Sequence, residues 1–194
     1  MSEGADGTAR DPIVRPATPD DSPAIADAHI RGWQTAYRGL VPDRILDGFD
    51  VARRAAWWRD HLRDRPAATD ERTWVVEADD GVAGFADGGP ARSDAVAAPV
   101  GAGEVYAIYL RPEHRGRGYG RALFTAAIGD LVERGYDPLV VWVFEANHDT
   151  RRFYAASGFQ PDGARNAIDF DGLAVLPEIR CLRRATTTAP SDRA

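Results

Sequence analysis

Residues 111–124 read RPEHRGRGYGRALF, and three glycines in this stretch alternate with arginine or tyrosine. The stretch leads into an apolar pattern with helical spacing, which predicts a helix from about residue 118 to residue 133. Before it, residues 104–110 (EVYAIYL) have the composition of a β-strand. The stretch is therefore predicted to be a strand-to-helix turn with an unusually bare backbone.

Such a turn is suited to binding an anion. The start of a helix leaves backbone N–H groups unpaired at the positive end of the helix dipole. Glycine lets a bulky phosphate approach those groups, and arginine adds charge and forked hydrogen bonding. The residues of the predicted diphosphate site are Arg115, Gly116, Arg117, Gly118, Tyr119, Gly120 and Arg121.

Three other interpretations compete with this one. The stretch could be a flexible turn whose arginines are simply solvated, but its place between a strand and a helix favours a binding role. A P-loop is excluded because the chain contains no lysine. A dinucleotide site is disfavoured, since Leu123 stands where its third glycine belongs and only Glu145 could bind the ribose.

The rest of the chain predicts a mixed α/β fold. Residues 139–144 (LVVWVF) are continuously apolar, as expected of a parallel strand buried on both faces. The strand-helix-strand unit over residues 104–144 implies a right-handed crossover with the glycine-rich turn at the ligand-binding edge. Further strands are expected over residues 13–17, 73–78 and 82–86, and two more within 165–182. Further helices are expected after Pro23, after Asp50 and over 150–157. A loop is expected over 87–103.

Composition limits the classes of protein that this chain could represent. Its 194 residues fit one domain, which we place at residues 12–184, and the polar ends at 1–11 and 185–194 are expected to be disordered. A net charge of −6 argues against general nucleic-acid binding. No signal peptide or apolar run of membrane-spanning length is found, so a cytoplasmic protein with no membrane partner is expected.

No metal site is expected. The four histidines lack metal-ligand spacing, and the single cysteine, Cys181, lies in an apolar segment that is more typical of a protein core than of a nucleophile.

Two motifs carry a resemblance to a known family. LRPEHRGRGYGRAL resembles the acyl-CoA signature (Q/R)xxGx(G/A) of the GNAT superfamily of N-acetyltransferases. Residues 147–159 (NHDTRRFYAASGF) resemble the second signature, with an asparagine, a tyrosine seven residues later and then Gly-Phe. The resemblance covers about residues 12–184 and implies a single, mostly antiparallel sheet of about six to seven strands with about four helices, in which the parallel β-α-β unit forms the acyl-CoA site.

The resemblance also implies the cosubstrate acetyl-CoA and roles for individual residues. The backbone of residues 108–110 should pair with the pantetheine arm, the glycine-rich turn should bind the pyrophosphate, and Asn147 should contact the pantetheine or cysteamine end. In addition to the turn, the resemblance thus implies four residues that bind the cosubstrate, namely Ile108, Tyr109, Leu110 and Asn147.

Direct acetyl transfer requires an amine that has lost its proton, a stabilised oxyanion and an acid for the leaving thiolate. The Leu110 N–H is the expected oxyanion donor. Tyr154 matches the signature tyrosine and is the candidate acid, although an aromatic residue in a helix can serve packing alone. Glu104 stands eleven residues before Arg115, where some members of the GNAT superfamily carry a catalytic glutamate. By that resemblance it is the candidate base, acting through water, and the alternative is an exposed carboxylate at a strand end.

The acceptor is left open by the sequence. HIRGWQTAYRGLVPDRIL resembles a bacterial GNAT subgroup that includes small-amine and polyamine acetyltransferases. By that likeness Trp33 and Tyr37 would line the acceptor pocket, whereas their helical spacing is equally typical of core residues. The expected partner is a small-molecule amine or a peptide, and the resemblance leaves a homodimer open. The alternative function is a catalytically silent acyl-CoA sensor.

Overall fold

The computed structural model describes residues 12–65, 69–92 and 96–184. Within this part of the chain, seven strands form one sheet in the order β1-β2-β3-β4-β5-β7-β6. Neighbouring strands are antiparallel except β4 and β5, which run parallel. The strands are β1 (Ile13–Pro16), β2 (Arg72–Ala78), β3 (Gly81–Pro90), β4 (Gly103–Leu110), β5 (Leu139–Phe144), β6 (Gln160–Asp169) and β7 (Val175–Arg183).

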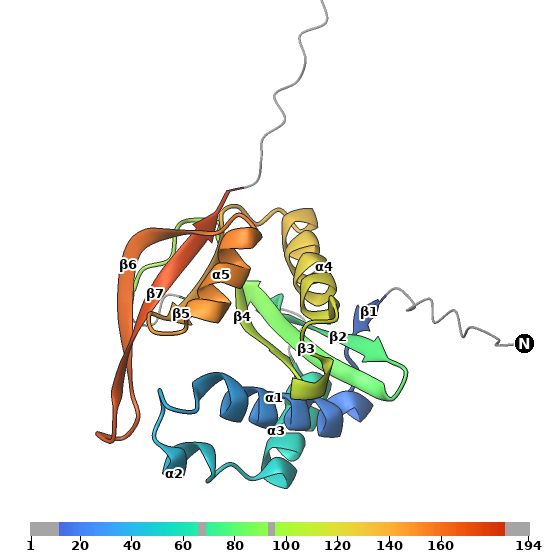
Figure 1. Cartoon of the computed structure of the whole chain (residues 1–194). Coiled ribbons are helices and arrows are strands. Elements are labelled where there is room, and N and C mark those ends of the chain that lie inside the picture. The colour runs from blue at the N-terminus through green and yellow to red at the C-terminus, as the bar shows by residue number, and fades with distance from the viewer. Residues whose placement is uncertain (1–11, 66–68, 93–95, 185–194) are drawn as a thin grey trace, which may run out of the picture.

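Helices cover both faces of the sheet (Figure 1). The helices α1 and α3 pack on one face around Phe85 and Trp58, and α4 and α5 pack on the other around Phe124 and Leu131. None of the helices in the described part of the chain combines the length and the apolar character needed to cross a membrane. The helices are α1 (Ser22–Tyr37), α2 (Asp43–Leu46), α3 (Val51–Asp64), α4 (Tyr119–Glu133) and α5 (His148–Ala156).

The predicted mixed α/β fold and its parallel β-α-β unit are confirmed. The loop expected over 87–103 is wrong at its start, because β3 continues to Pro90 and pairs there with β4. Glycine-rich composition at 88–89 suggested a loop, but pairing on both sides, with β2 and β4, keeps this segment in the sheet. The four-residue α2 was not predicted from the sequence.

Close packing of β3 on β4 requires a glycine at position 84. A Cβ atom on Gly84 would lie 2.4 Å from the carbonyl oxygen of Tyr109 and 2.4 Å from Cδ2 of Leu110. Gly84 pairs with Leu110 in the β3–β4 register. The absence of a side chain at Gly84 therefore lets β3 approach Tyr109 and Leu110 closely. These are the last residues of β4 before the glycine-rich turn.

We predict that Gly84→Ala lowers the free energy of unfolding by about 1–3 kcal/mol, because overpacking forces the two strands apart. Gly129 is the matched control, since it lies inside α4 and a Cβ atom there would meet no atom within 4 Å. Gly129→Ala should stabilise the protein by roughly 0.5–1 kcal/mol through helix propensity. Urea unfolding of both variants tests this, and equal stability of the two would contradict it.

Candidate active site

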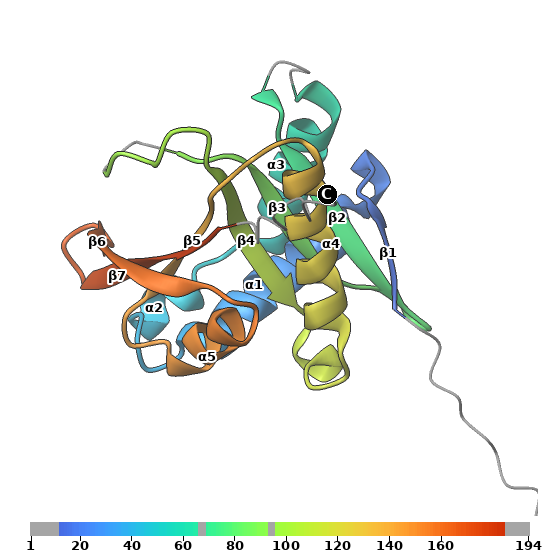
Figure 2. The same cartoon turned by 90° about the horizontal axis from the view of Figure 1, so that it is seen from above.

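The strands β4 and β5 separate soon after they meet. They pair only at Gly103↔Leu139 and Glu104↔Val140. Beyond this point, no strand among the described residues pairs with the β5-facing edge of β4, and the two halves of the sheet diverge (Figure 2). A bulge at Tyr106, where the β3 partners shift between Asp87 and Gly88, adds to the irregularity. The edge of β4 is thus left with backbone groups that a ligand could pair with.

The glycine-rich turn lies at the end of this open edge. Gly116 and Gly118 have φ values of 75° and 87°, and Gly118 is the N-cap residue of α4. A Cβ atom at either position would meet nothing within 4 Å, so the backbone conformation and not crowding demands glycine there. Arg115 and Arg121 are exposed, and neither forms an ion pair with another described residue. The turn is therefore an open, positively charged site at a helix start.

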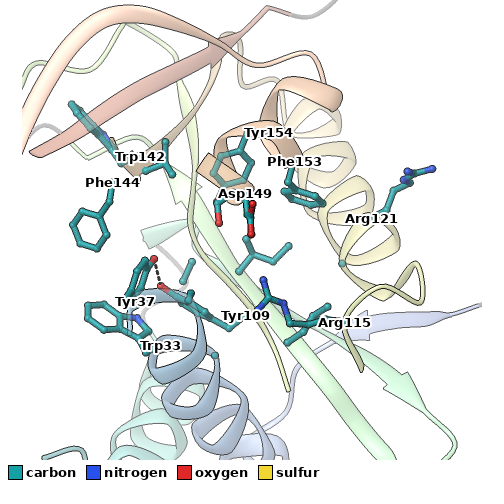
Figure 3. Close-up of a pocket in the computed structure, with 18 of the residues that line it drawn as sticks. Trp33, Tyr37, Tyr109, Arg115, Arg121, Trp142, Phe144, Asp149, Phe153 and Tyr154 are labelled. Atoms are coloured by element: carbon teal, nitrogen blue, oxygen red, sulfur yellow. Dashed lines mark hydrogen bonds between the residues drawn. The ribbon is translucent and has the colours of Figure 1, made fainter. Parts of the chain in front are cut away.

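A cavity of about 580 Å³ runs from this turn into the space between β4 and β5. Figure 3 shows Arg115 and Arg121 at one end, Tyr154 between the two ends, and at the other end a group of rings made up of Trp33, Tyr37, Trp142 and Phe144. The predicted site residues that line it are Trp33, Tyr37, Ile108, Tyr109, Leu110, Arg115, Gly116, Gly118, Gly120, Arg121 and Tyr154. The predicted residues outside its lining are Glu104, Arg117, Tyr119 and Asn147.

The aromatic end is built from α1 and β5. The ring centroids of Trp33 and Tyr37 lie 4.8 Å apart, and those of Tyr37 and Phe144 lie 5.0 Å apart, both edge to face. Trp142 completes this wall of the cavity (Figure 3). Sequence reasoning missed Trp142 and Phe144 as site residues. The signal was their alternate spacing on β5, which directs both side chains to the face away from α4.

Tyr154 projects from α5 toward the middle of the cavity (Figure 3). It is only 6% exposed, and its ring packs against that of Phe124 at 5.3 Å. Burial raises the pKa of the Tyr154 hydroxyl, and the neighbouring Tyr37 and Cys181 raise it further. The hydroxyl therefore stays protonated at neutral pH and can act as a proton donor. Burial also raises the pKa of the Cys181 thiol, which keeps it protonated.

Two of the predicted residues outside the cavity lining, Glu104 and Asn147, are buried and hydrogen-bonded. Glu104 is 5% exposed at the point where β4 and β5 part, and its carboxylate accepts a hydrogen bond of 2.9 Å from the backbone N–H of Arg92. The Asn147 side chain caps α5 by accepting a hydrogen bond of 3.1 Å from the backbone N–H of Thr150, which itself lines the cavity.

Glu178 is a further residue that sequence reasoning missed. It lies on β7 opposite Phe144, is half-buried and lines the cavity. Burial raises the pKa of the Glu178 carboxyl, the carboxylate of Glu104 raises it further, and a hydrogen bond from Asn166 acts in the opposite direction. No sequence motif marks this position. Only the pairing of β7 with β5 brings it to the site.

A half-buried histidine supports the floor of the aromatic end. The His29 ring stacks on Tyr109 at 5.2 Å, and its Nδ1 accepts a hydrogen bond of 3.3 Å from the indole N–H of Trp58. The hydroxyls of Tyr109 and Tyr37 lie 3.2 Å apart. Burial, with a smaller contribution from Arg54, lowers the pKa of His29 to about 3. The imidazole is therefore neutral in the folded protein at neutral pH, which agrees with its Nδ1 acting as the acceptor of the Trp58 hydrogen bond.

Metal binding has no structural support in the described residues, where no group of three or more His, Cys, Asp or Glu side chains could hold an ion.

Comparison with known proteins identifies the family. The model of the "Acetyltransferase (GNAT) family" matches residues 33–159. The chain belongs to this family. It is also 33% identical over 135 residues to an uncharacterized N-acetyltransferase, YuaI, of Bacillus subtilis (strain 168), covering 69% of this chain and 72% of that protein. The chain is therefore an acyl-CoA-dependent N-acetyltransferase.

Solved structures support the GNAT fold. The PaiA N-acetyltransferase of Thermoplasma acidophilum, crystallised with coenzyme A, superposes with a TM-score of 0.68 at 16% identity, over 91% of this chain and 100% of that one. The yncA protein of Salmonella typhimurium, solved with acetyl-CoA, gives a TM-score of 0.65 at 22% identity, over 95% and 100%. At these identities the likeness concerns the fold of the acetyltransferase alone.

The neutral state of His29 predicts a pH-dependent stability. Above pH 6.5 the residue is neutral in both the folded and unfolded states, and below it only the unfolded chain takes up the proton, until about pH 3. Between pH 6.5 and pH 4 the wild type should lose about 3 kcal/mol more stability than His29→Phe. Urea unfolding across this range measures the difference. The control variant is His148→Gln, because His148 is exposed, and its free energy of unfolding should change with pH as that of the wild type does. If the free energy of unfolding of His29→Phe changed with pH in the same way, the assignment to His29 would be wrong.

Proposed function

We propose that this acetyltransferase transfers the acetyl group of acetyl-CoA directly to a primary amine of a small acceptor. One observation carries the proposal. A single cavity joins an arginine- and glycine-lined end to an aromatic end, and a buried, protonated tyrosine lies between them (Figure 3). An anionic cosubstrate and an amine acceptor could therefore meet at Tyr154 without a covalent enzyme intermediate.

Acetyl-CoA would enter from the glycine-rich turn. Its pyrophosphate is assigned to the N–H groups of residues 116–121, with Arg115, Arg117 and Arg121 around it and Tyr119 on the first turn of α4. The pantetheine arm would pair with the open edge of β4 at residues 108–110, as an added strand does. Asn147, which caps α5, would border the cysteamine end. The complexes of the Thermoplasma and Salmonella proteins with coenzyme A and acetyl-CoA support this choice of cosubstrate.

The reaction would proceed by direct attack. The acceptor ammonium loses a proton through water to Glu104, and the free amine attacks the thioester carbonyl carbon. The Leu110 N–H stabilises the oxyanion of the tetrahedral intermediate. The C–S bond then breaks and Tyr154 donates its proton to the thiolate. The nitrogen gives up its second proton, which restores the Tyr154 hydroxyl through solvent, and Glu104 releases its proton to solvent. The products are the N-acetylated amine and free coenzyme A.

The remaining expectations from the sequence stay predictions. They concern the small-amine or polyamine subgroup, a domain over residues 12–184, a cytoplasmic location, a homodimer, and the absence of metal and nucleic-acid partners. The alternative of a silent acyl-CoA sensor gains no support from the relatives, which are named as acetyltransferases.

We predict that Tyr154→Phe lowers acetyl transfer by about 10²-fold, because the leaving thiolate loses its acid, while acetyl-CoA affinity is unchanged. The assay is thiol release from acetyl-CoA over a panel of polyamines, aminoglycosides, amino acids and short peptides. Tyr136→Phe, outside the cavity lining, is the matched control and should keep full activity. Full turnover by Tyr154→Phe would remove this residue from the mechanism. Acetyl-CoA binding without turnover on any acceptor would favour the sensor.

We predict that Glu104→Gln lowers kcat and abolishes the rise in rate with pH that reports deprotonation of the base. The amide oxygen still accepts the hydrogen bond from Arg92, so the fold should persist. The control is Glu145→Gln, whose carboxylate is paired with Arg165 outside the cavity lining. An unchanged pH–rate profile for Glu104→Gln would show that the base is another group or bulk water.

A further inference from the structure

Glu178 faces the aromatic end of the cavity because of the strand register. On β5, Val141 and Val143 point into the core beneath α4, so Trp142 and Phe144 point to the opposite face. Glu178 is the cross-strand partner of Phe144 and shares its face. The carboxylate therefore stands beside the rings that form the acceptor end.

The charge of Glu178 lacks a counter-charge in the described part of the chain. Arg180, the nearest cation along β7, donates to the Asp162 carboxylate at 2.8 Å and to the Ala97 carbonyl at 2.9 Å, and its guanidinium lies over Trp142. The neighbouring charge that influences Glu178 is the carboxylate of Glu104, which has the same sign. A half-buried carboxylate in such a setting is stabilised by a cation, and here the ligand is the group that can supply it.

The surroundings of Glu178 specify what else the ligand carries. At this end of the cavity the walls are formed by the rings of Trp33, Tyr37, Trp142 and Phe144. Such rings attract an ammonium ion and also cover apolar groups. The other carboxylate of the lining, Asp149, is exposed on α5 and already paired with Arg152. Trp33 also lines a second cavity of about 190 Å³, whose other lining residues are apolar, among them Ile45 and Phe170, apart from His29 and Arg54. The acceptor end therefore matches one positive charge and an apolar body.

We propose that Glu178 binds the protonated amine of the acceptor, and that the acceptor is a monocationic primary amine with an apolar or aromatic body. The inference rests on the proposed function, which it deepens by naming the acceptor class. Glu178 is an acceptor-binding residue in this account, and Glu104 keeps the role of base. The carboxylate holds the nitrogen at the aromatic end, from which it reaches the thioester beside Tyr154.

The test compares two probes of nearly equal shape, 2-phenylethylammonium and the neutral 2-phenylethanol. Binding to the full-length protein saturated with coenzyme A is followed by tryptophan fluorescence, because Trp33 and Trp142 line the cavity. The wild type should bind the ammonium at least about tenfold more tightly than the alcohol, as expected for a charge-assisted hydrogen bond. Glu178→Gln should abolish this preference, and Glu178→Asp should retain part of it.

Controls separate this proposal from the others. Glu145→Gln should keep the preference, and thermal unfolding should confirm that each variant is folded. With any acceptor that turns over, Glu178→Gln should raise the acceptor KM about tenfold or more and leave the acetyl-CoA KM unchanged. The binding test does not depend on turnover, so a failure of the acetyl-transfer proposal is recognised independently by absent thiol release.

Three results would overturn the inference. The first is a wild type that binds the alcohol as tightly as the ammonium ion. The second is a folded Glu178→Gln variant that keeps the preference. The third is binding of 1,4-diaminobutane at least tenfold tighter than that of n-butylamine, which would reveal a second anionic subsite and point to a polyamine acceptor.

Discussion

The separation of β4 from β5 after the Glu104↔Val140 pair is the constraint on which the site depends. Strand β5 keeps a full ladder on its other side with β7, so it stays in the sheet while its β4-facing edge opens. Aromatic rings from α1 line one side of the opening, where Tyr37 packs against Phe144. Gly32 allows this helix to approach, since a Cβ atom there would lie 2.9 Å from the Tyr109 ring. The cavity is thus a consequence of sheet geometry and close helix packing.

The two sides of this opening differ in chemistry. The glycine-rich turn presents unpaired N–H groups and arginines at the start of α4, which favours an anion. The opposite side presents aromatic rings and the carboxylate of Glu178, which favours a cation. Tyr154 lies where the two meet, in surroundings that keep its hydroxyl protonated (Figure 3). In the proposed mechanism, the fold therefore brings oppositely charged reactants together at Tyr154.

The sequence predicted those parts of the fold and site that depend on local residues. The turn at 115–121 combines glycines, arginines and a helix start within seven residues, so its conformation could be read directly. For the aromatic wall, the alternate spacing of Trp142 and Phe144 shows that they share a face, but an apolar run such as 139–144 does not reveal which face opens onto a cavity. The position of Glu178 depends on the register of β7 against β5, far apart in the chain. Glu104 was proposed as the base from the family resemblance, which did not show that this residue would lie outside the cavity lining.

The most direct test of this account is a crystal structure with acetyl-CoA bound. The account predicts the pantetheine amides paired with residues 108–110, the pyrophosphate on the N–H groups of residues 116–121, and the sulfur within hydrogen-bonding reach of the Tyr154 hydroxyl. The acetyl group should point toward the aromatic end. A cosubstrate bound elsewhere, or an acetyl group directed away from Trp33 and Phe144, would contradict the central claim that the opening between β4 and β5 is the site of acetyl transfer.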